Sequence, residues 1–382
     1  MAVIEIGIAV NGATGRIGST QHLKNALVPI RAEGGLPCGP DRIVPRPLLL
    51  GRDGVKLKAL ADSLGLAEWS TDLDAALADP AFPVFFDAAA TAQRPAVLAK
   101  AIEAGKHIYT EKPVAGSVAE GLRLLAAMRA RGLKHGAVED KQYLPGFRKL
   151  AAAIQSGALG RIVSFKLEFG WWVFDGAERP CQRPSWNYKK PGGGIVSDMH
   201  PHWRYVVENI VGPIRRVVAA TATATPERID ERGARYAVDV EDTAATLLEL
   251  DNGAIGTILS SWATRVKRDD LVVFQVDGTL GSAVAGLHRC KIQTSAATPV
   301  IHAFNPAADL GIDYHADWVD APDAGPTVNP YRVGWEDFLR HVAADAPLRS
   351  TFAAGLRDLL LAEACQRSAA TGAWVELGPI TD

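Results

Sequence analysis

The sequence has few of the features that mark a nucleic-acid-binding or membrane protein. Its formal net charge is −2 over 382 residues and no basic run exceeds a few residues, so we expect neither nucleic acid nor a charged membrane surface as a partner. No apolar run reaches the roughly 20 residues that a membrane-spanning helix needs. The start, MAVIEIGIAV, lacks the basic residues and the small-residue cleavage site of a signal peptide.

Cysteine is also scarce, with four residues at positions 38, 181, 290 and 365. They form no CxxC pair and no cluster with histidine, so we expect no disulfide framework and no metal site. A reducing cytoplasm suits this composition. The chain is 48% hydrophobic, and its length of 382 residues predicts two domains.

The N-terminus carries the pattern of a nucleotide-binding unit. Residues 3–10 form an apolar run typical of a buried parallel strand, the turn NGATGRIG follows at 11–18, and a helix is expected to about residue 30. Such a turn aims backbone N–H groups at a pyrophosphate, although Ala13 takes the first glycine place of G-x-G-x-x-G. The expected cofactor contacts here are Gly12, Thr14, Gly15, Arg16 and Ile17.

The second strand leaves the choice of cofactor open. Residues 32–47 resemble an exposed insertion rich in Gly and Pro, and the strand is expected at 48–50. An acidic residue at its tip, here Asp53, suits the ribose diol of NAD. Arg52 suits the 2′-phosphate of NADP or the adenine face.

Strands and helices then alternate, which predicts a doubly wound parallel sheet over residues 1–140. Thr91, after the third strand, is a further candidate for cofactor contact. The predicted strands lie at 84–88, 107–109 and 134–139, and the predicted helices at 95–104 and 118–130.

The segment GKHIYTEKP, residues 105–113, ends a short strand in a charged turn. Lys112, between Glu111 and Pro113, is well placed to point one ammonium into a crevice at the end of the sheet. We expect Lys112 to face the reacting carbon of a substrate, and both Glu111 and Lys112 to contact the cofactor. A surface turn with a solvated lysine is the alternative.

The second half of the chain has the pattern of an antiparallel sheet. Residues 162–169 alternate apolar and polar side chains, and Asp251-Asn252-Gly253 joins two strand-like runs as a hairpin turn. Asp277-Gly278 does the same for the next pair. We therefore expect a second, α+β domain over residues 141–382, with the helices of about 331–371 as candidates to return to the first domain.

Three glycines at 192–194 precede a helix-like run that contains Asp198 and His202. Their i, i+4 spacing places both on one helix face, where a carboxylate orients an imidazole that acts as a base. A helix cap with a packed histidine is the alternative. Pro201 predicts a helix that starts near Asp198 or kinks there, and His200 is a second imidazole close by.

Together the glycine turn, GKHIYTEKP and GGGxxxDxxxH resemble the glucose-fructose oxidoreductase / inositol dehydrogenase / MocA family, as does SGALGRI at 156–162. The resemblance covers essentially the whole chain. It implies an α/β fold, with a Rossmann domain followed by an α+β domain whose large, mainly antiparallel open sheet often joins subunits. It also implies NAD or NADP as cofactor, a sugar or polyol substrate, and a homo-oligomer, either a dimer or a tetramer.

By this resemblance Lys112, Asp198 and His202 are the catalytic residues, and the bond before Pro113 is often cis. The chain departs from the family where Thr91-Ala92-Gln93-Arg94 replaces a Thr-Pro-Asn and a histidine, so the contacts of that loop with the nicotinamide ribose do not carry over. The extra imidazole of His200 leaves the identity of the base open.

Aromatic and basic residues between the two halves are candidates for substrate contact. Trp172 and Trp186 suit a wall for a sugar ring, with core packing as the alternative. Basic side chains in the same stretch suit an anionic substituent, unless they are simply solvated. The residues expected to contact substrate are Lys141, Tyr143, Trp172, Arg183, Trp186, Lys189 and His200.

The implied reaction passes hydride to nicotinamide while His202 takes the hydroxyl proton and Lys112 favours the charge on the oxygen. A second possibility is an NAD-dependent glycoside hydrolase that oxidises transiently, eliminates, and acts on an anionic sugar. A non-catalytic sensor is disfavoured because Lys112, Asp198 and His202 are all present.

Overall fold

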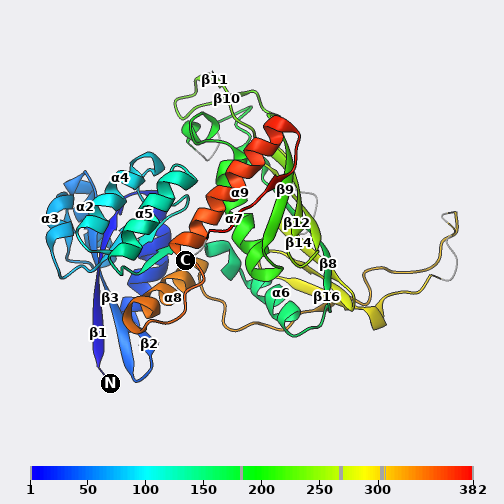
Figure 1. Ribbon diagram of the computed structural model, residues 1–382, viewed down its shortest axis with the longest axis horizontal. Coiled ribbons are helices and arrows are strands. Elements are labelled where there is room, and N and C mark those ends of the chain that lie inside the picture. The colour runs from blue at the N-terminus through cyan, green and yellow to red at the C-terminus, as the bar shows by residue number, and fades with distance from the viewer. Residues whose placement is uncertain (1, 181–183, 266–269, 302–304, 306, 381–382) are drawn as a thin grey trace. The chain divides into compact units, whose positions relative to one another are not determined.

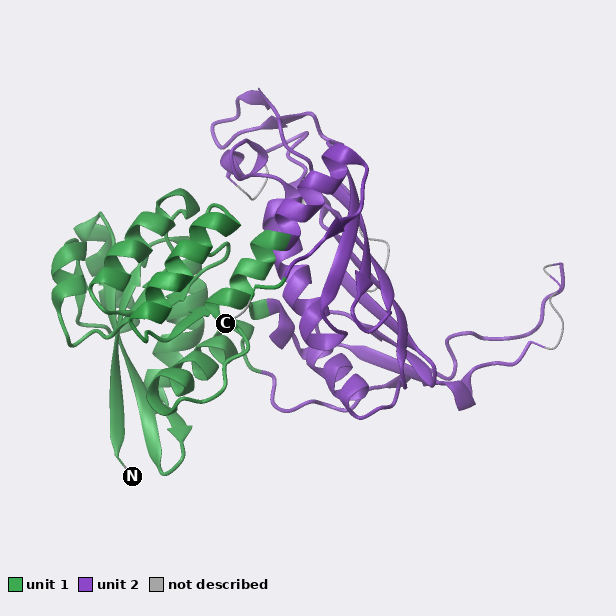
Figure 2. Ribbon diagram, viewed as in Figure 1, with its two compact units in different colours: residues 1–140, 328–360, 379–382 green, residues 141–327, 361–378 purple. Residues whose placement is uncertain are grey.

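The computed structural model describes residues 2–380 except 181–183, 266–269, 302–304 and 306. The chain divides into two compact units (Figures 1 and 2). Unit 1 comprises residues 1–140, 328–360 and 379–382, and unit 2 comprises residues 141–327 and 361–378. Within the described part, no helix is long and apolar enough to cross a membrane.

Unit 1 is the doubly wound sheet that the sequence predicts. Its strand order is β2-β3-β1-β5-β6-β7, with β4 also paired to β3, and every pairing except that of β2 is parallel. The strands are β1 (Val3–Asn11), β2 (Leu36–Cys38), β3 (Asp41–Leu50), β4 (Trp69–Ser70), β5 (Val84–Asp87), β6 (His107–Thr110) and β7 (His135–Ala137).

Two hydrophobic clusters cover the two faces of this sheet, as a doubly wound fold requires. One packs η1, α2 and α8 against the sheet, and the other packs α3, α4, α5 and the start of α9 against it. Side-chain caps on Asp53, Asp72 and Ser117 begin α2, α3 and α5. The helical segments are η1 (Ile17–Leu27), α1 (Val28–Ala32), α2 (Gly54–Leu64), α3 (Leu73–Ala78), η2 (Thr91–Gln93), α4 (Arg94–Glu103), α5 (Val118–Ala130), α8 (Pro330–Ala344) and α9 (Phe352–Thr371).

The expectation of an exposed insertion at residues 32–47 is wrong, because β3 runs through Asp41–Leu50 and pairs with β1 from Arg42 to Leu50. In β3, Arg42 bonds toward the β1 side, whereas Leu49 donates to Glu68 on the other side. Backbone groups of successive residues point to opposite sides of a strand, so Pro45 and Pro47 face the same side as Leu49, away from β1. Among the described residues no strand pairs with 44–48 on that side, so their missing N–H groups break no ladder bond.

Unit 2 is built on a nine-stranded sheet in the order β17-β16-β15-β14-β8-β13-β12-β9-β18. Both predicted hairpins are confirmed, as β12 with β13 and β14 with β15. The strand predicted at 162–169 is β8, which is antiparallel to β14 but parallel to β13. The strands are β8 (Ile162–Gly170), β9 (Ile214–Ala222), β10 (Glu227–Ile229), β11 (Arg235–Ala237), β12 (Thr243–Leu250), β13 (Ile255–Ser261), β14 (Val272–Gly278), β15 (Gly281–Ala285), β16 (Cys290–Thr294), β17 (Val319–Asp320) and β18 (Val375–Glu376).

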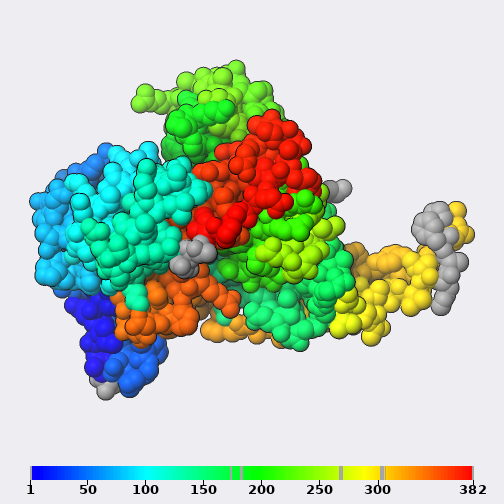
Figure 3. All heavy atoms as spheres, in the orientation of Figure 1, coloured from blue at the N-terminus to red at the C-terminus, as the bar shows by residue number. Residues whose placement is uncertain are grey.

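One face of this sheet forms the core of unit 2 with α6, α7 and the end of α9. The other face leaves alternate residues of β12 and β13 exposed. Between β16 and β17 the described residues form an arm that stands out from the rest of unit 2 (Figure 3). The helical segments are η3 (Asp140–Tyr143), α6 (Pro145–Gln155), η4 (Trp172–Phe174), η5 (Ser185–Tyr188), α7 (Ile195–Ile210) and η6 (Ser295–Ala297).

His200, in α7, is fully buried in this core, and its Nε2 lies 2.8 Å from Thr246 Oγ1 on β12. Burial disfavours the charged ring and lowers its pKa from 6.5 to about 4. Between these two values the unfolded chain binds more protons than the folded one, so stability falls as the pH falls through this window.

We predict that the unfolding free energy of the natural chain drops by about 3 kcal/mol more than that of His200→Gln between about pH 7 and about pH 4. Urea unfolding of both proteins at several pH values measures the difference. If the unfolding free energy changed with pH equally in both proteins, the buried, neutral state assigned to His200 would be wrong.

Candidate active site

The glycine turn after β1 is closely packed. Gly12 has φ +75°, and a Cβ there would come within 2.8 Å of the backbone after β5. A Cβ on Gly18 would lie 2.5 Å from Gly12 O, so the first helical turn approaches the loop as only glycine allows. Thr14, Gly15 and Arg16 are exposed, and no side chain caps η1. These features suit a pyrophosphate at the helix start.

Just after β3, the carboxylate of Asp53 accepts a hydrogen bond from the main chain. Its Oδ1 accepts a hydrogen bond of 3.1 Å from Lys56 N and so caps α2, and this bond lowers its pKa. Arg52 is exposed and has no ion-pair partner among the described residues. It borders an open hollow of about 890 Å³ that α2 and Trp69 also line.

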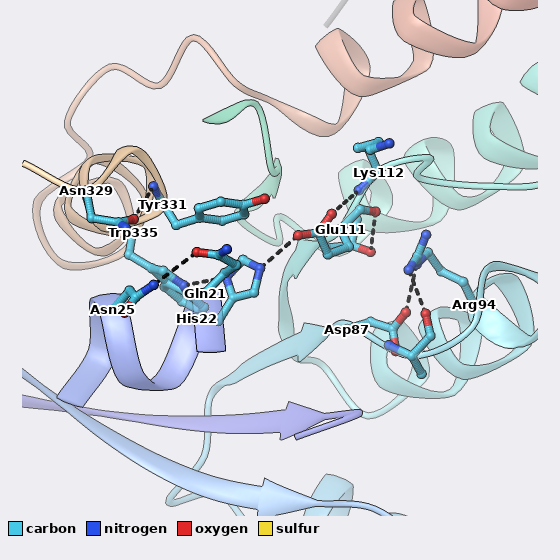
Figure 4. A network of polar contacts seen from close by, with 12 residues as sticks. Gln21, His22, Asn25, Asp87, Arg94, Glu111, Lys112, Asn329, Tyr331 and Trp335 are labelled. Atoms are coloured by element: carbon cyan, nitrogen blue, oxygen red, sulfur yellow. Dashed lines mark hydrogen bonds and ion pairs between the residues drawn. The ribbon is translucent and has the colours of Figure 1, made fainter. Parts of the chain in front are cut away.

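The segment after β6 carries Lys112, which is partly exposed, and the Lys112–Pro113 bond is cis. Glu111 is 9% exposed and both its carboxylate oxygens accept hydrogen bonds. Oε1 lies 2.8 Å from His22 Nε2, and Oε2 lies 3.1 Å from Lys112 N (Figure 4). Glu111 therefore holds its own segment, whereas the sequence suggested a contact with cofactor.

Arg94 lies in the segment whose sequence departs from the family motif. Its side chain points into the core of unit 1 and is 2% exposed. Its Nε donates to Asp87 Oδ2 at 2.7 Å (Figure 4). Its terminal nitrogens donate to Ala89 O at 2.9 Å and to Pro113 O at 2.5 Å. The arginine thus ties the loop after β5 to the segment that carries Lys112. Thr91 lies in that loop and is partly exposed.

In unit 2, α7 begins at Ile195, ahead of the predicted start near Asp198, and continues through Pro201. Glu241 explains the earlier start. Its carbonyl and its Oε1 accept hydrogen bonds from Ile195 N and Val196 N at 3.0 and 3.1 Å. Burial raises the pKa of Glu241.

Asp198 and His202 lie one turn apart on this continuous helix, with Asp198 partly exposed and His202 7% exposed. His202 Nδ1 lies 2.6 Å from Tyr205 Oη, which also accepts a hydrogen bond of 3.1 Å from Lys141 N. The imidazole is therefore oriented through Nδ1. Sequence reasoning missed Tyr205, although its i+3 spacing from His202 was a usable signal.

The structure contradicts a substrate contact for His200. The residue is fully buried and bonds to Thr246, so a ligand cannot reach it without opening the core. The other imidazole of this helix, His202, is the remaining candidate for the base.

The aromatic residues between the halves divide into two groups. Tyr188 and Phe174 are buried, and Phe174 O accepts hydrogen bonds from Tyr188 Oη at 2.8 Å and from Arg228 at 2.6 Å. Trp186 is 62% exposed, and Trp172 is partly exposed. Core packing therefore explains the first pair only.

The remaining substrate candidates are on the surface or outside the described residues. Lys189 is exposed, with its Nζ 4.4 Å from the ring centre of Tyr236. Lys141 and Tyr143 are partly exposed in η3, and Arg183 lies outside the described residues. The described part of the chain holds no group of three or more His, Cys, Asp or Glu side chains arranged for a metal ion.

Comparison with known proteins agrees with this architecture. Residues 6–137 match the model of an oxidoreductase family with an NAD-binding Rossmann fold, and residues 147–284 match the GFO/IDH/MocA C-terminal domain. A solved levoglucosan dehydrogenase in complex with NADH and L-sorbose has the same fold, with a TM-score of 0.80 and 24% identity over 98% of this chain and 99% of that one.

Two curated relatives are similar in sequence. A D-xylose dehydrogenase of Paenarthrobacter nicotinovorans is 43% identical over 364 residues, which are 94% of each protein. A levoglucosan dehydrogenase of Pseudarthrobacter phenanthrenivorans is 27% identical over 316 residues, which are 74% of this chain and 76% of that protein. The family that the three motifs predicted is thereby confirmed: the chain belongs to the GFO/IDH/MocA family of NAD-binding oxidoreductases.

Proposed function

We propose that the protein oxidises a monosaccharide with a nicotinamide cofactor, with D-xylose as the first substrate to test. The 43% identity to a D-xylose dehydrogenase over nearly the full length supports this choice of sugar. One structural observation carries the catalytic part of the proposal. The backbone around Lys112 is held on both sides, by Glu111 on its N–H and by Arg94 on the next carbonyl.

The glycine turn fits the cofactor that this function needs. Gly12 and Gly18 have no side chains, so the loop can pack against the backbone after β5 and against the first turn of η1. Bound nicotinamide dinucleotide would supply the hydride acceptor. The residues that would hold it are Gly12, Thr14, Gly15, Arg16, Ile17 and Thr91, with Arg52 at the adenosine end.

Lys112, Asp198 and His202 are the proposed catalytic residues. The Lys112 ammonium donates a hydrogen bond to the substrate oxygen and stabilises its developing negative charge. His202 takes the hydroxyl proton at Nε2. A base at Nε2 needs a lone pair there, so we assign the Nδ1–H tautomer to His202, in which Nδ1 donates to Tyr205 Oη. Asp198 holds a second hydroxyl or the imidazole.

Exposed side chains of unit 2 are the proposed contacts of the sugar ring. Trp172 and Trp186 offer apolar faces for stacking, and Lys141, Tyr143 and Lys189 offer polar groups. Arg183 is also proposed to contact the substrate, on the basis of the sequence alone.

A panel of pentoses, hexoses and their glycosides, incubated with NAD+ or NADP+ and followed at the nicotinamide absorbance, tests the reaction. We expect net formation of reduced nicotinamide with D-xylose or a close relative. Release of an aglycone without net reduction of nicotinamide would favour the redox-neutral hydrolase instead.

Lys112→Met should lower turnover about 100-fold to 1,000-fold, because it removes the donor to the charged oxygen. Cofactor affinity, measured by quenching of tryptophan fluorescence, should stay unchanged. Lys100→Met, at an exposed lysine on α4, is the matched control. Equal turnover in both variants would remove Lys112 from the mechanism.

We further propose that Arg52 lets the chain use NADP as well as NAD, since Asp53 is occupied as the cap of α2. Arg52→Ala should weaken NADPH binding about 10-fold to 100-fold, because it removes a charge-assisted hydrogen bond to the 2′-phosphate. NADH binding should stay nearly unchanged. Lys24→Ala, an exposed lysine on η1, controls for net charge. Titration of both nucleotides gives the answer, and equal losses for the two would exclude a contact with the 2′-phosphate.

The outer face of the unit 2 sheet supports a homo-oligomer. Leu247, Ile255 and Leu259 are 38%, 52% and 39% exposed on neighbouring strands β12 and β13. We propose that a second copy covers this face. Leu259→Arg should lower the molar mass in light scattering toward that of a monomer, whereas Leu122→Arg on α5 should not. A monomeric natural chain would refute the proposal.

A further inference from the structure

Two sets of buried polar side chains end on the Glu111–Lys112–Pro113 segment of unit 1 (Figure 4). Arg94 reaches Pro113 O, as described above. On the other side, Trp335 Nε1 donates a hydrogen bond of 2.9 Å to His22 Nδ1, and His22 Nε2 lies 2.8 Å from Glu111 Oε1. The first of these bonds joins residues 313 positions apart, on α8 and η1.

The indole fixes the tautomer of His22. An indole N–H can only donate, so Nδ1 of His22 must accept and carry no proton. The proton of the neutral ring is then on Nε2, which donates to Glu111 Oε1. A second proton on the ring would point at the indole N–H. Since His22 is fully buried, water cannot relieve that clash.

Glu111 passes this constraint to Lys112. With His22 bonded to one carboxylate oxygen, the other oxygen accepts the Lys112 backbone N–H at 3.1 Å. Glu111 is 9% exposed and its own backbone N–H donates to Asp87 O at 2.9 Å, so the sheet sets its position. A rotation of Glu111 would release the main chain of Lys112.

We propose that Trp335 is a positioning residue for Lys112, which acts through His22 and Glu111. The proposal rests on the proposed function, because it gives Lys112 a catalytic role. Trp335 acts on His22, to which its indole donates. Its N–H keeps His22 in the tautomer that donates to Glu111, and Glu111 in turn holds the lysine main chain.

Other polar groups around His22 do not supply this constraint. The ring of Tyr331 lies 5.1 Å from that of His22, edge to face, and burial raises the Tyr331 pKa well above its ordinary value, with Asp140 and Glu111 adding to the rise and Arg16 opposing it. Tyr331 therefore stays neutral near neutral pH. Glu111 is the one charged side chain that bonds to His22 among the described residues.

Trp335→Phe isolates the hydrogen bond. The ring of Trp335 packs against Phe86 and Tyr109, with centroids at 5.0 and 4.7 Å, and phenylalanine keeps most of that contact. Without the indole N–H, Nδ1 of His22 is free to take the proton, which leaves Nε2 as an acceptor facing a carboxylate. We expect the kcat to fall about fivefold, with the KM for cofactor unchanged.

Two measurements on the full-length variant test this chain of contacts. Nitrogen-15 NMR of labelled histidine reports the tautomer, with the His22 signal assigned by its loss in His22→Gln. We expect the Nε2–H form in the natural chain and an added Nδ1–H or doubly protonated form in Trp335→Phe. The pH profile of kcat in Trp335→Phe should also differ from the profile of the natural chain, which His202 governs as the proposed base.

Phe338→Leu is the packing control. Phe338 lies on the same helix, stacks on Tyr109 at 4.5 Å and has no polar atom, so its loss should keep the tautomer and the pH profile. The proposal is overturned if Trp335→Phe keeps the Nε2–H form and the natural pH profile, or if Phe338→Leu reproduces its effects. If Lys112→Met is fully active, the catalytic role of Lys112 in the proposed function fails, and the NMR result then reports the hydrogen bond alone.

Discussion

Two ion pairs hidden from solvent hold the segments on which the proposed chemistry depends. Arg94 pairs with Asp87 in unit 1, where the side chains are 2% and 0% exposed, and Arg228 pairs with Asp242 in unit 2, where both are 0% exposed. A charge is tolerated away from water only where a partner and further hydrogen bonds are supplied. Each guanidinium is therefore confined to one place, and each donates to a main-chain carbonyl beside candidate site residues. The arrangement recurs in two unrelated folds within one chain.

Much of the fold was predictable because its signals are local. The turn at 11–18 and the hairpin turn at 251–253 have backbone requirements that few residues meet, so they mark their neighbouring strands. The end of β3 was predicted at 48–50, but its residues 41–47 were taken for a loop because they contain prolines. The start of α7 was misplaced because its cap comes from Glu241, a residue outside the helix. Where a boundary depends on a distant partner, periodicity carries no information about it.

The candidate site shows the same division. Lys112, Asp198 and His202 were named from short motifs, whereas the contacts of His22, Arg94 and Trp335 emerged only from the structure. Their roles arise from contacts between remote segments, and nothing in their local sequence announces those contacts. His200 was included as a second imidazole close to His202, but its side chain faces the core. Motifs thus single out candidate reacting groups, and tertiary packing reveals the side chains that hold their segments.

The prolines of β3 have a consequence for the behaviour of the protein at high concentration. An open strand edge with a free row of N–H donors is a template for aggregation. Pro45 and Pro47 remove two donors in succession from the stretch of β3 that neither β2 nor β4 covers. A strand from another molecule that paired with this stretch would find carbonyl acceptors but no N–H donors at Pro45 and Pro47. The two prolines therefore oppose edge-to-edge pairing where the sheet leaves β3 uncovered.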